Sequence, residues 1–152
     1  MRPEDLVTHE RQLHSLRDVT EGYRQLGIRV ESEVRSVPLH SLIATQNAIE
    51  RHKYELVLPL VARGKLDVPV LVEEHFVDGQ YRRYLIDGHT RIRARIDLGQ
   101  RSTPAFVVWS PAGDWPSNFV QVAAQYGDVL VKDLPIIDVE RPPPGEEPAT
   151  SG

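Results

Sequence analysis

The stretch that most constrains the fold of this chain runs from residue 84 to residue 99, where a strand, a turn and a helix follow one another directly. Residues 84–86 are aromatic and apolar, as suits a buried strand. Gly88 lets the backbone turn, and residues 91–98 are rich in helix formers up to Gly99. Residues 87–90 are therefore expected to form a polar turn between the end of a strand and the start of a helix.

This turn has the features of an anion site. A helix that starts there directs unpaired backbone N–H groups, and the positive end of its dipole, at whatever lies above the turn. Arg91 falls in the first helical turn, where its charge opposes the dipole unless an anion or a carboxylate compensates it. The alternative interpretation makes Asp87 an ordinary N-cap that accepts the amides of His89 or Thr90, with Arg91 and His89 solvated.

The composition is that of one globular domain. With 152 residues and 40% hydrophobic content, the chain can build a single core, and we expect one domain over residues 1–139. No apolar run is long enough to cross a bilayer and the N-terminus does not read as a secretory signal, so we expect a cytoplasmic protein without a membrane partner. The absence of cysteine excludes disulfides, thiolate metal sites and cysteine nucleophiles.

Charge does not favour nucleic acid as a partner. The net charge is −4, so no global positive field attracts a phosphate backbone. Locally, six of the 18 lysines and arginines gather around the turn, namely Arg82, Arg83, Arg91, Arg93, Arg95 and Arg101. The sequence does not decide between a monomer and a homodimer.

The first half of the chain predicts a helix, a strand and a second helix. Residues 4–26 begin with helix-start residues and carry apolar side chains at helical spacing. Residues 28–37 alternate as a strand does, and residues 48–58 read as a helix that Thr45 or Asn47 can cap. Pro59 is expected to kink or divide this helix.

The second half of the chain predicts a hairpin followed by a further strand, a helix and an extended arm. Residues 68–76 and 81–86 are strands joined by the hairpin turn Asp78-Gly79, so the return strand delivers Asp87 at its end. Residues 103–109 form a further strand, which the intervening helix would reach by a right-handed crossover. The later segments are predicted as a helix (117–126), a strand or extended arm (129–139) and a disordered tail (140–152) that lacks apolar residues to bury.

These motifs, in this order, resemble the ParB/sulfiredoxin superfamily. The resemblance covers about residues 34–109 and rests on Val37-Pro38-Leu39, Val68 to Val72, Ile86-Asp87-Gly88-His89-Thr90-Arg91, Ala94, Leu98-Gly99 and Pro104 to Val108. It implies an α/β (α+β) domain with a small mixed β-sheet and flanking helices, which binds a nucleotide with its phosphates over the turn. Carried over, Gly88, His89, Thr90 and Arg91 are phosphate contacts. Gln46 is the polar residue expected to face them.

The branches of this family differ in chemistry, and the residues here separate them. Sulfiredoxins carry a cysteine in the turn, which this chain lacks. The chromosome-partitioning branch has Gly-Glu-Arg-Arg at the turn, binds CTP and needs a following DNA-binding domain, for which too little chain follows residue 110. The Asp-Gly-His-Xaa-Arg form is similar to stand-alone members, which include free-serine kinases. That likeness implies Asp87 and His89 as the catalytic or metal-proximal pair, although Thr90 stands where the kinases have a second histidine.

Three function classes follow from the resemblance. The first is a phosphotransferase that uses ATP or ADP and Mg²⁺, held by Asp87, to phosphorylate a serine-like small molecule. The kinases use a glutamate base near the position of Gln46, and glutamine cannot act as a base, so Glu50 is the candidate one turn later. The second is a non-catalytic regulatory module that binds ATP, ADP or CTP. The third is a DNA-acting nuclease or partition factor.

Overall fold

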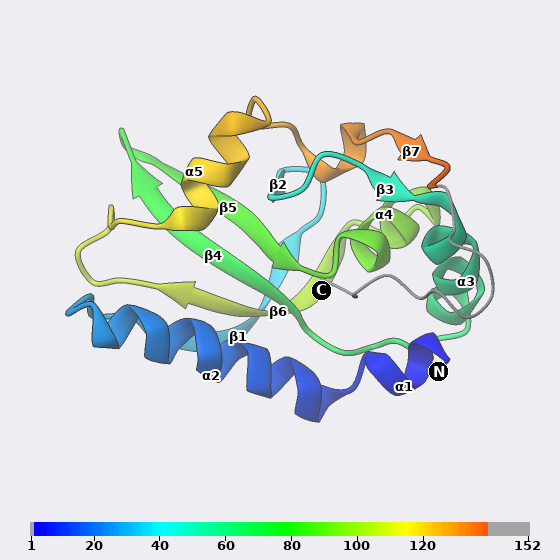
Figure 1. Cartoon of the computed structure of the whole chain (residues 1–152), viewed down its shortest axis with the longest axis horizontal. Coiled ribbons are helices and arrows are strands. Elements are labelled where there is room, and N and C mark those ends of the chain that lie inside the picture. Colours follow the sequence, from blue (N-terminus) through cyan, green and yellow to red (C-terminus); the bar gives the residue numbers. More distant parts are fainter. Residues whose placement is uncertain (1, 140–152) are drawn as a thin grey trace.

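The computed structural model describes residues 2–139, so the tail predicted to be disordered, residues 140–152, lies outside the described part. A five-stranded mixed sheet forms the centre, which confirms the predicted α+β class (Figure 1). Its strands, in spatial order, are β1 (Glu31–Pro38), β6 (Ser102–Trp109), β4 (Val70–Val77), β5 (Gln80–Asp87) and β2 (Ile43–Ala44). The pairs β6–β4 and β5–β2 are parallel, and β1–β6 and β4–β5 are antiparallel.

The hairpin of β4 and β5 confirms the turn predicted at residues 78–79. Asp78 and Gly79 both have positive φ angles, 53° and 77°, as the tight hairpin turn that matches strand twist requires. Asp87 is the last residue of β5, as expected. The predicted right-handed crossover is wrong, because β6 runs parallel to β4 and antiparallel to β5, and the handedness rule applies to parallel strands.

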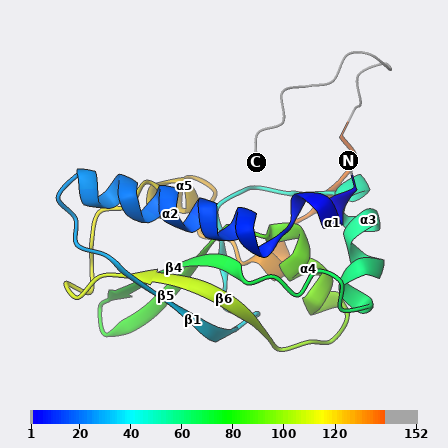
Figure 2. The same ribbon diagram turned by 90° about the horizontal axis from the view of Figure 1, so that it is seen from below.

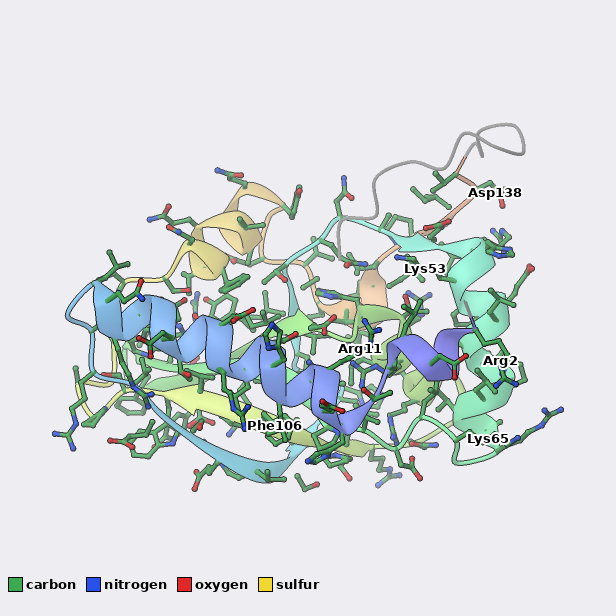
Figure 3. The ribbon with its side chains drawn as sticks, turned by 60° about the horizontal axis from the view of Figure 1, so that its bottom comes forward. Arg2, Arg11, Lys53, Lys65, Phe106 and Asp138 are labelled. Carbon is green, nitrogen blue, oxygen red and sulfur yellow. The ribbon has the colours of Figure 1, made fainter. Side chains whose placement is uncertain are left out.

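Two helices cover one face of the sheet. They are α2 (His9–Gln25) and α5 (Asn118–Gln125), and Figure 2 shows both above the strands. The helix predicted over residues 4–26 is divided into α1 (Pro3–Leu6) and α2, because Thr8 acts as the N-cap of α2 and accepts a hydrogen bond from the Arg11 amide. Phe106 lies beneath α2 in Figure 3, with its ring edge-on to His9 at 5.5 Å.

A buried polar network fixes α2 to this face. The Tyr23 hydroxyl donates to Glu73 Oε2 at 2.6 Å, and His75 Nε2 lies 2.8 Å from Glu73 Oε1. Ser117 Oγ, at the N-cap of α5, is 3.0 Å from the Tyr23 hydroxyl. Burial first, and then the charge of Glu73, raise the pKa of Tyr23. The network sets the position of α2 along the sheet.

The opposite face of the sheet is covered at one end only. The elements there are β3 (Ile49–Glu50), α3 (Arg51–Ala62), α4 (His89–Asp97), η1 (Val131–Asp133) and β7 (Ile136–Ile137). Between these elements and the sheet lies a second hydrophobic core, separate from the one under α2, around Val72, Leu85, Ile92 and Val107. Helix α3 continues through Pro59, and the arm predicted at 129–139 is strand only at β7. No helix of residues 2–139 is both long and apolar enough to span a membrane.

At the hairpin end, no helix of residues 2–139 covers this opposite face (Figure 2). Charged side chains lie there instead. The Glu74 carboxylate accepts two bonds from Arg35, at 2.9 and 3.1 Å, and one from Arg83 at 2.9 Å. Burial alone would raise the pKa of Glu74, but the bonds and charges of the two arginines lower it overall. Arg83 is therefore already paired within the protein.

Candidate functional site

The turn between β5 and α4 is built around Gly88. This residue is the N-cap of α4, with a φ angle of 110°, so the interpretation of Asp87 as the N-cap is wrong. A Cβ atom at Gly88 would lie 2.6 Å from Val70 Cγ1, so the position needs glycine for both its conformation and its space. No side chain caps α4, and the backbone amides of its first turn are the unpaired donors expected of a helix start.

Gln12 of α2 links the two charged residues of the turn. Its Nε2 donates to Asp87 Oδ2 at 3.1 Å, and its Oε1 accepts from Arg91 at 2.7 Å. Arg91 also donates to the backbone oxygen of Val68 at 2.9 Å. Helix α2 is thus joined to the turn through one glutamine.

The Arg91 guanidinium points into the protein. It is 4% exposed, and burial lowers its pKa to about 10, an effect that the charge of Asp87 opposes. The alternative of a solvated Arg91 is therefore wrong, because Gln12 and Val68 bind its side chain. Its compensating carboxylate is Asp87, reached through Gln12. Its Nη2 lies beside Gly88, 3.1 Å from where a Cβ of that residue would be.

His89 is buried and neutral. Burial lowers its pKa to about 4, although the charge of Asp87 opposes the change. Its Nε2 accepts a hydrogen bond from the Thr45 amide at 3.0 Å, so the proton of the neutral ring is on Nδ1. Nδ1 has no partner in the described part of the chain. The alternative of a solvated His89 is wrong, and the ring offers one unused N–H donor at the helix start.

The loop after β2 lies beside the turn because β2 and β5 are parallel and end at the same edge of the sheet. The sequence suggested Thr45 as a helix cap, but in the structure Thr45 caps no helix of the described residues. Its hydroxyl donates to the Leu85 oxygen at 2.7 Å, and Asn47 does not cap α3 either, since the N-cap is Glu50. Gln46 follows Thr45 directly, but its amide nitrogen donates to Ala48 O at 2.7 Å, within its own loop.

Glu50 belongs to a different element from the turn. It ends β3, which pairs with β7, and no hydrogen bond joins its side chain to residues 87–91 in the described part of the protein. The structure thus places Asp87, Gly88, His89 and Thr90 together at the turn. Gln46 is next to Thr45, which contacts His89. Glu50 has no hydrogen bond to these residues in the part of the chain that the structure describes.

Gln12 is the residue of this site that sequence reasoning missed. It is separated from Asp87 by 75 residues, so no local motif includes it. One signal was available: Gln12 lies four residues before Leu16 and shares the buried side of α2 with Leu16 and Tyr23. A polar side chain on that side needs a partner.

The turn supplies too few protein ligands to bind a metal ion by itself. No cluster of three or more histidines and carboxylates that could bind a metal exists among residues 2–139. Asp87 is an exposed carboxylate whose Oδ2 accepts from Gln12, which leaves Oδ1 available. Mg²⁺ is commonly held by one carboxylate together with phosphate oxygens and water. Asp87 alone therefore supplies one carboxylate ligand, and the remaining ligands of a metal ion would have to come from a bound molecule and water.

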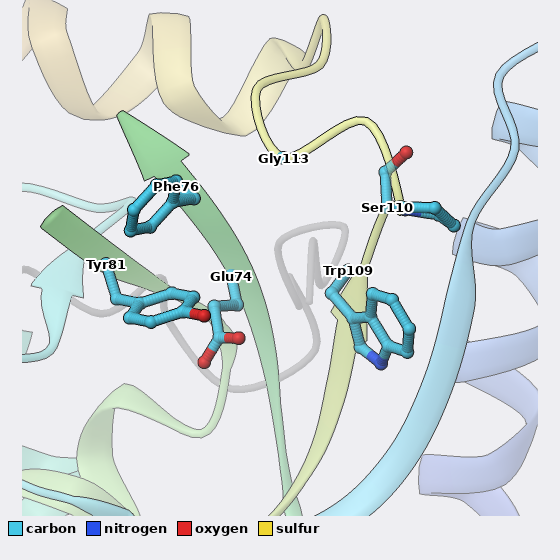
Figure 4. A pocket seen from close by; sticks show the side chains of 7 residues that line it. Glu74, Phe76, Tyr81, Trp109, Ser110 and Gly113 are labelled. Carbon is cyan, nitrogen blue, oxygen red and sulfur yellow. The ribbon is translucent and has the colours of Figure 1, made fainter. Parts of the chain in front are cut away.

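A separate pocket lies at the hairpin end of the sheet and contains none of the predicted site residues. Its volume is about 260 Å³, and its lining includes Glu74, Phe76, Tyr81, Trp109, Ser110 and Gly113 (Figure 4). Trp109 Nε1 is buried there without a hydrogen-bond partner in the described part of the chain. The pocket has aromatic walls and no helix start, so it does not share the chemistry of the turn.

Comparison with known proteins adds little to this geometry. No family model and no curated protein matches the sequence. The chain is similar to the crystal structure of protein Atu1540 from Agrobacterium tumefaciens, with 22% identity and a TM-score of 0.48. The similarity covers 65% of this chain and 50% of that one, so the chain spans about half the length of this neighbour. A likeness of this strength carries no argument about the function of the turn.

Proposed function

We propose that this chain binds a nucleotide, with the phosphates at the start of α4. The observation that carries the proposal is a neutral histidine, His89, that offers a free Nδ1–H beside a helix start without a side-chain cap. Backbone amides at a helix start favour a phosphate through their hydrogen bonds and the helix dipole. A neutral N–H donor adds to them at any pH above the pKa of the ring.

Each residue of the turn has a distinct part in this proposal. Gly88 allows a phosphate to approach the backbone, and the amides of His89 and Thr90 donate to it. The Thr90 hydroxyl is half-buried and has no partner among the described residues, so it can donate as well. Arg91, which is buried and bound by Gln12 and Val68, contributes positive charge next to Gly88. The base, in ATP, ADP or CTP, is proposed from the ParB/sulfiredoxin resemblance, with Gln46 as the nearby amide.

The second candidate function is phosphoryl transfer to a small, serine-like acceptor. The exposed Asp87 carboxylate favours it, since this group can hold Mg²⁺ or orient an acceptor hydroxyl. Two observations favour the non-catalytic regulatory alternative: Glu50 has no hydrogen bond to residues 87–91 in the described part of the protein, and position 46 is an amide. Catalysis is therefore the narrower proposal and binding the broader one.

A DNA-acting function has less support from the geometry. Several arginines around the turn bind acceptors of the protein itself: Arg83 binds Glu74, Arg91 binds Gln12, and Arg95 binds Asp67 at 2.9 Å. Side chains paired in this way are not free to neutralise a phosphate backbone.

Nucleotide binding is tested by the melting temperature with ATP, ADP, CTP and GTP, each with and without Mg²⁺. A specific ligand raises the melting temperature by mass action, and titration calorimetry then gives its affinity. Thr90→Val removes the hydroxyl at nearly constant shape and should weaken binding about fivefold or more. Ser41→Ala, at an exposed serine outside the turn, is the control. If none of the nucleotides binds, the proposal is wrong.

Catalysis is tested by phosphoryl transfer from ATP or ADP to a panel of hydroxy amino acids that begins with serine. Asp87→Asn keeps an acceptor for Gln12 and removes the charge, so turnover should fall by orders of magnitude while the melting temperature is nearly kept. If the wild-type protein binds a nucleotide tightly and transfers phosphate to no acceptor, the catalytic proposal fails and the regulatory one stands.

A further inference from the structure

Strand β1 forms an open edge of the sheet. It is eight residues long, pairs only with β6, and has no strand on its outer side among residues 2–139 (Figure 1). Val34, at its middle, is 60% exposed. Long edge strands offer unpaired backbone groups to another strand.

The backbone groups that point outward from β1 can be identified. Leu39, which continues the register of β1, donates its amide to Arg101 O at 3.0 Å, so the residues of β1 in phase with Leu39 bond to β6. Ser36 is opposite Pro104, which has no N–H, and this agrees with a pair that exchanges no bonds. The outward N–H and C=O groups are therefore those of Ser32, Val34 and Ser36.

We propose that two copies of the chain pair through β1, antiparallel, about a two-fold axis at Val34. In this register Val34 is opposite Val34 of the second copy, and Ser32 is opposite Ser36 of the second copy. Every outward N–H of the three residues then meets a carbonyl of the other strand. The exposed valine side chains contact each other across the axis.

The charges of β1 select this register. The side chains of Glu33 and Arg35 lie on the face of the sheet opposite to that of Val34. In this arrangement each Glu33 is opposite Arg35 of the second copy. A shift of the pairing by two residues in one direction would place Glu33 opposite Glu33, and in the other direction Arg35 opposite Arg35. A shift by one residue would align outward groups with inward groups.

Arg35 is held ready for this contact. Its two terminal nitrogens bind Glu74, and its Nε has no hydrogen bond in the described part of the protein, although Glu33 Oε1 lies 2.7 Å away. The Glu33 side chain is 51% exposed, so pairing through β1 can exchange its ion pair with Arg35 of the same strand for one with Arg35 of the second copy. An incoming carboxylate would therefore meet a guanidinium whose position is already fixed.

Because the chain contains no cysteine, single-cysteine variants test the register directly. Facing Cα atoms in a bonded antiparallel pair are about 5.5 Å apart, within reach of a disulfide. Val34→Cys should cross-link to itself under mild oxidation. Ser32→Cys and Ser36→Cys should cross-link when mixed with each other and not alone, since each is roughly 13 Å from its own copy. Self-linking of Ser32→Cys, or no cross-link by any variant, would overturn the register.

The strength of pairing is tested by sedimentation or light scattering over a range of concentrations. We expect a dimer in the wild-type protein. Glu33→Arg turns both charge pairs into repulsive ones and should raise the dimer Kd at least about tenfold, whereas Glu55→Arg on the exposed side of α3 should not. Val34→Pro should abolish the dimer and keep the fold, because it removes only an outward N–H. A wild-type monomer at every concentration, or a dimer that survives Glu33→Arg, would overturn the proposal.

Discussion

At the scale of single residues, the pairing of Arg91 with Gln12 decides which property a mutation changes. Arg91→Ala removes charged hydrogen bonds to Gln12 and Val68 and should lower the free energy of unfolding by about 3 kcal/mol. Denaturant unfolding measures this, with Arg11→Ala on the exposed side of α2 as the control. Unchanged stability together with a tenfold loss of nucleotide affinity would instead mean that the guanidinium faces the ligand.

His89 should make stability depend on pH in a defined window. Its pKa in the folded protein is about 4, below the ordinary value of 6.5, so between these values the unfolded chain binds more protons. Stability should be constant above pH 6.5 and fall by up to about 3 kcal/mol as the pH drops to 4. His89→Gln, which keeps an acceptor for Thr45, should flatten the upper part of this window. An identical pH profile for this variant and the wild type would contradict the assignment.

The polar residues of the turn could be predicted from the sequence, but the hydrogen-bond partners of their side chains could not. Gly88 and Asp87 were placed correctly because the signals of a strand end and a turn are local. The environment of Arg91 depends on Gln12, which is remote in sequence and reaches the turn only through the packing of α2 on the sheet. Neither the composition nor the spacing of residues predicts how α2 packs on the sheet.

At the scale of elements, the junction of β5 and α4 should depend on one glycine. Gly88→Ala adds a Cβ that would lie 2.6 Å from Val70 Cγ1 in a conformation with positive φ, so we expect a loss of about 3 kcal/mol or more. Gly79→Ala is the matched control: its φ is 77° and no atom lies within 4 Å of the added Cβ, so only the backbone cost of about 1–2 kcal/mol remains. Equal melting temperatures would contradict the steric argument.

The prediction of elements succeeded where the cause is local and failed where it is not. Asp78-Gly79 fixed the hairpin, since this turn type suits the twist of both strands. The division of the first helix at Thr8 was missed, although threonine is a good N-cap, because apolar spacing continues across it. The choice of β4 rather than β5 as the parallel neighbour of β6 depends on the whole sheet.

At the scale of the whole molecule, the sheet separates three surfaces with different chemistry. Helices α2 and α5 occupy one face, the turn at the start of α4 lies at the end covered by the second core, and β1 is the open edge (Figures 1 and 2). Pairing through β1 would leave the turn accessible, because β2 and β5, which flank it, are at the opposite side of the sheet from β1. Nucleotide binding and dimer formation should therefore be measurable independently.

The boundary of the folded unit can be tested by truncation. Residues 140–152 have few apolar side chains to bury, so ending the chain after Val139 should leave the melting temperature and nucleotide affinity unchanged. Ending it after Pro135 is the matched control. That cut removes β7, which pairs with β3, and Asp138, whose Oδ1 accepts from Arg51 at 2.9 Å, so the melting temperature should fall by several degrees. A similar loss from the first truncation would mean that residues 140–152 dock on this chain or on a second copy.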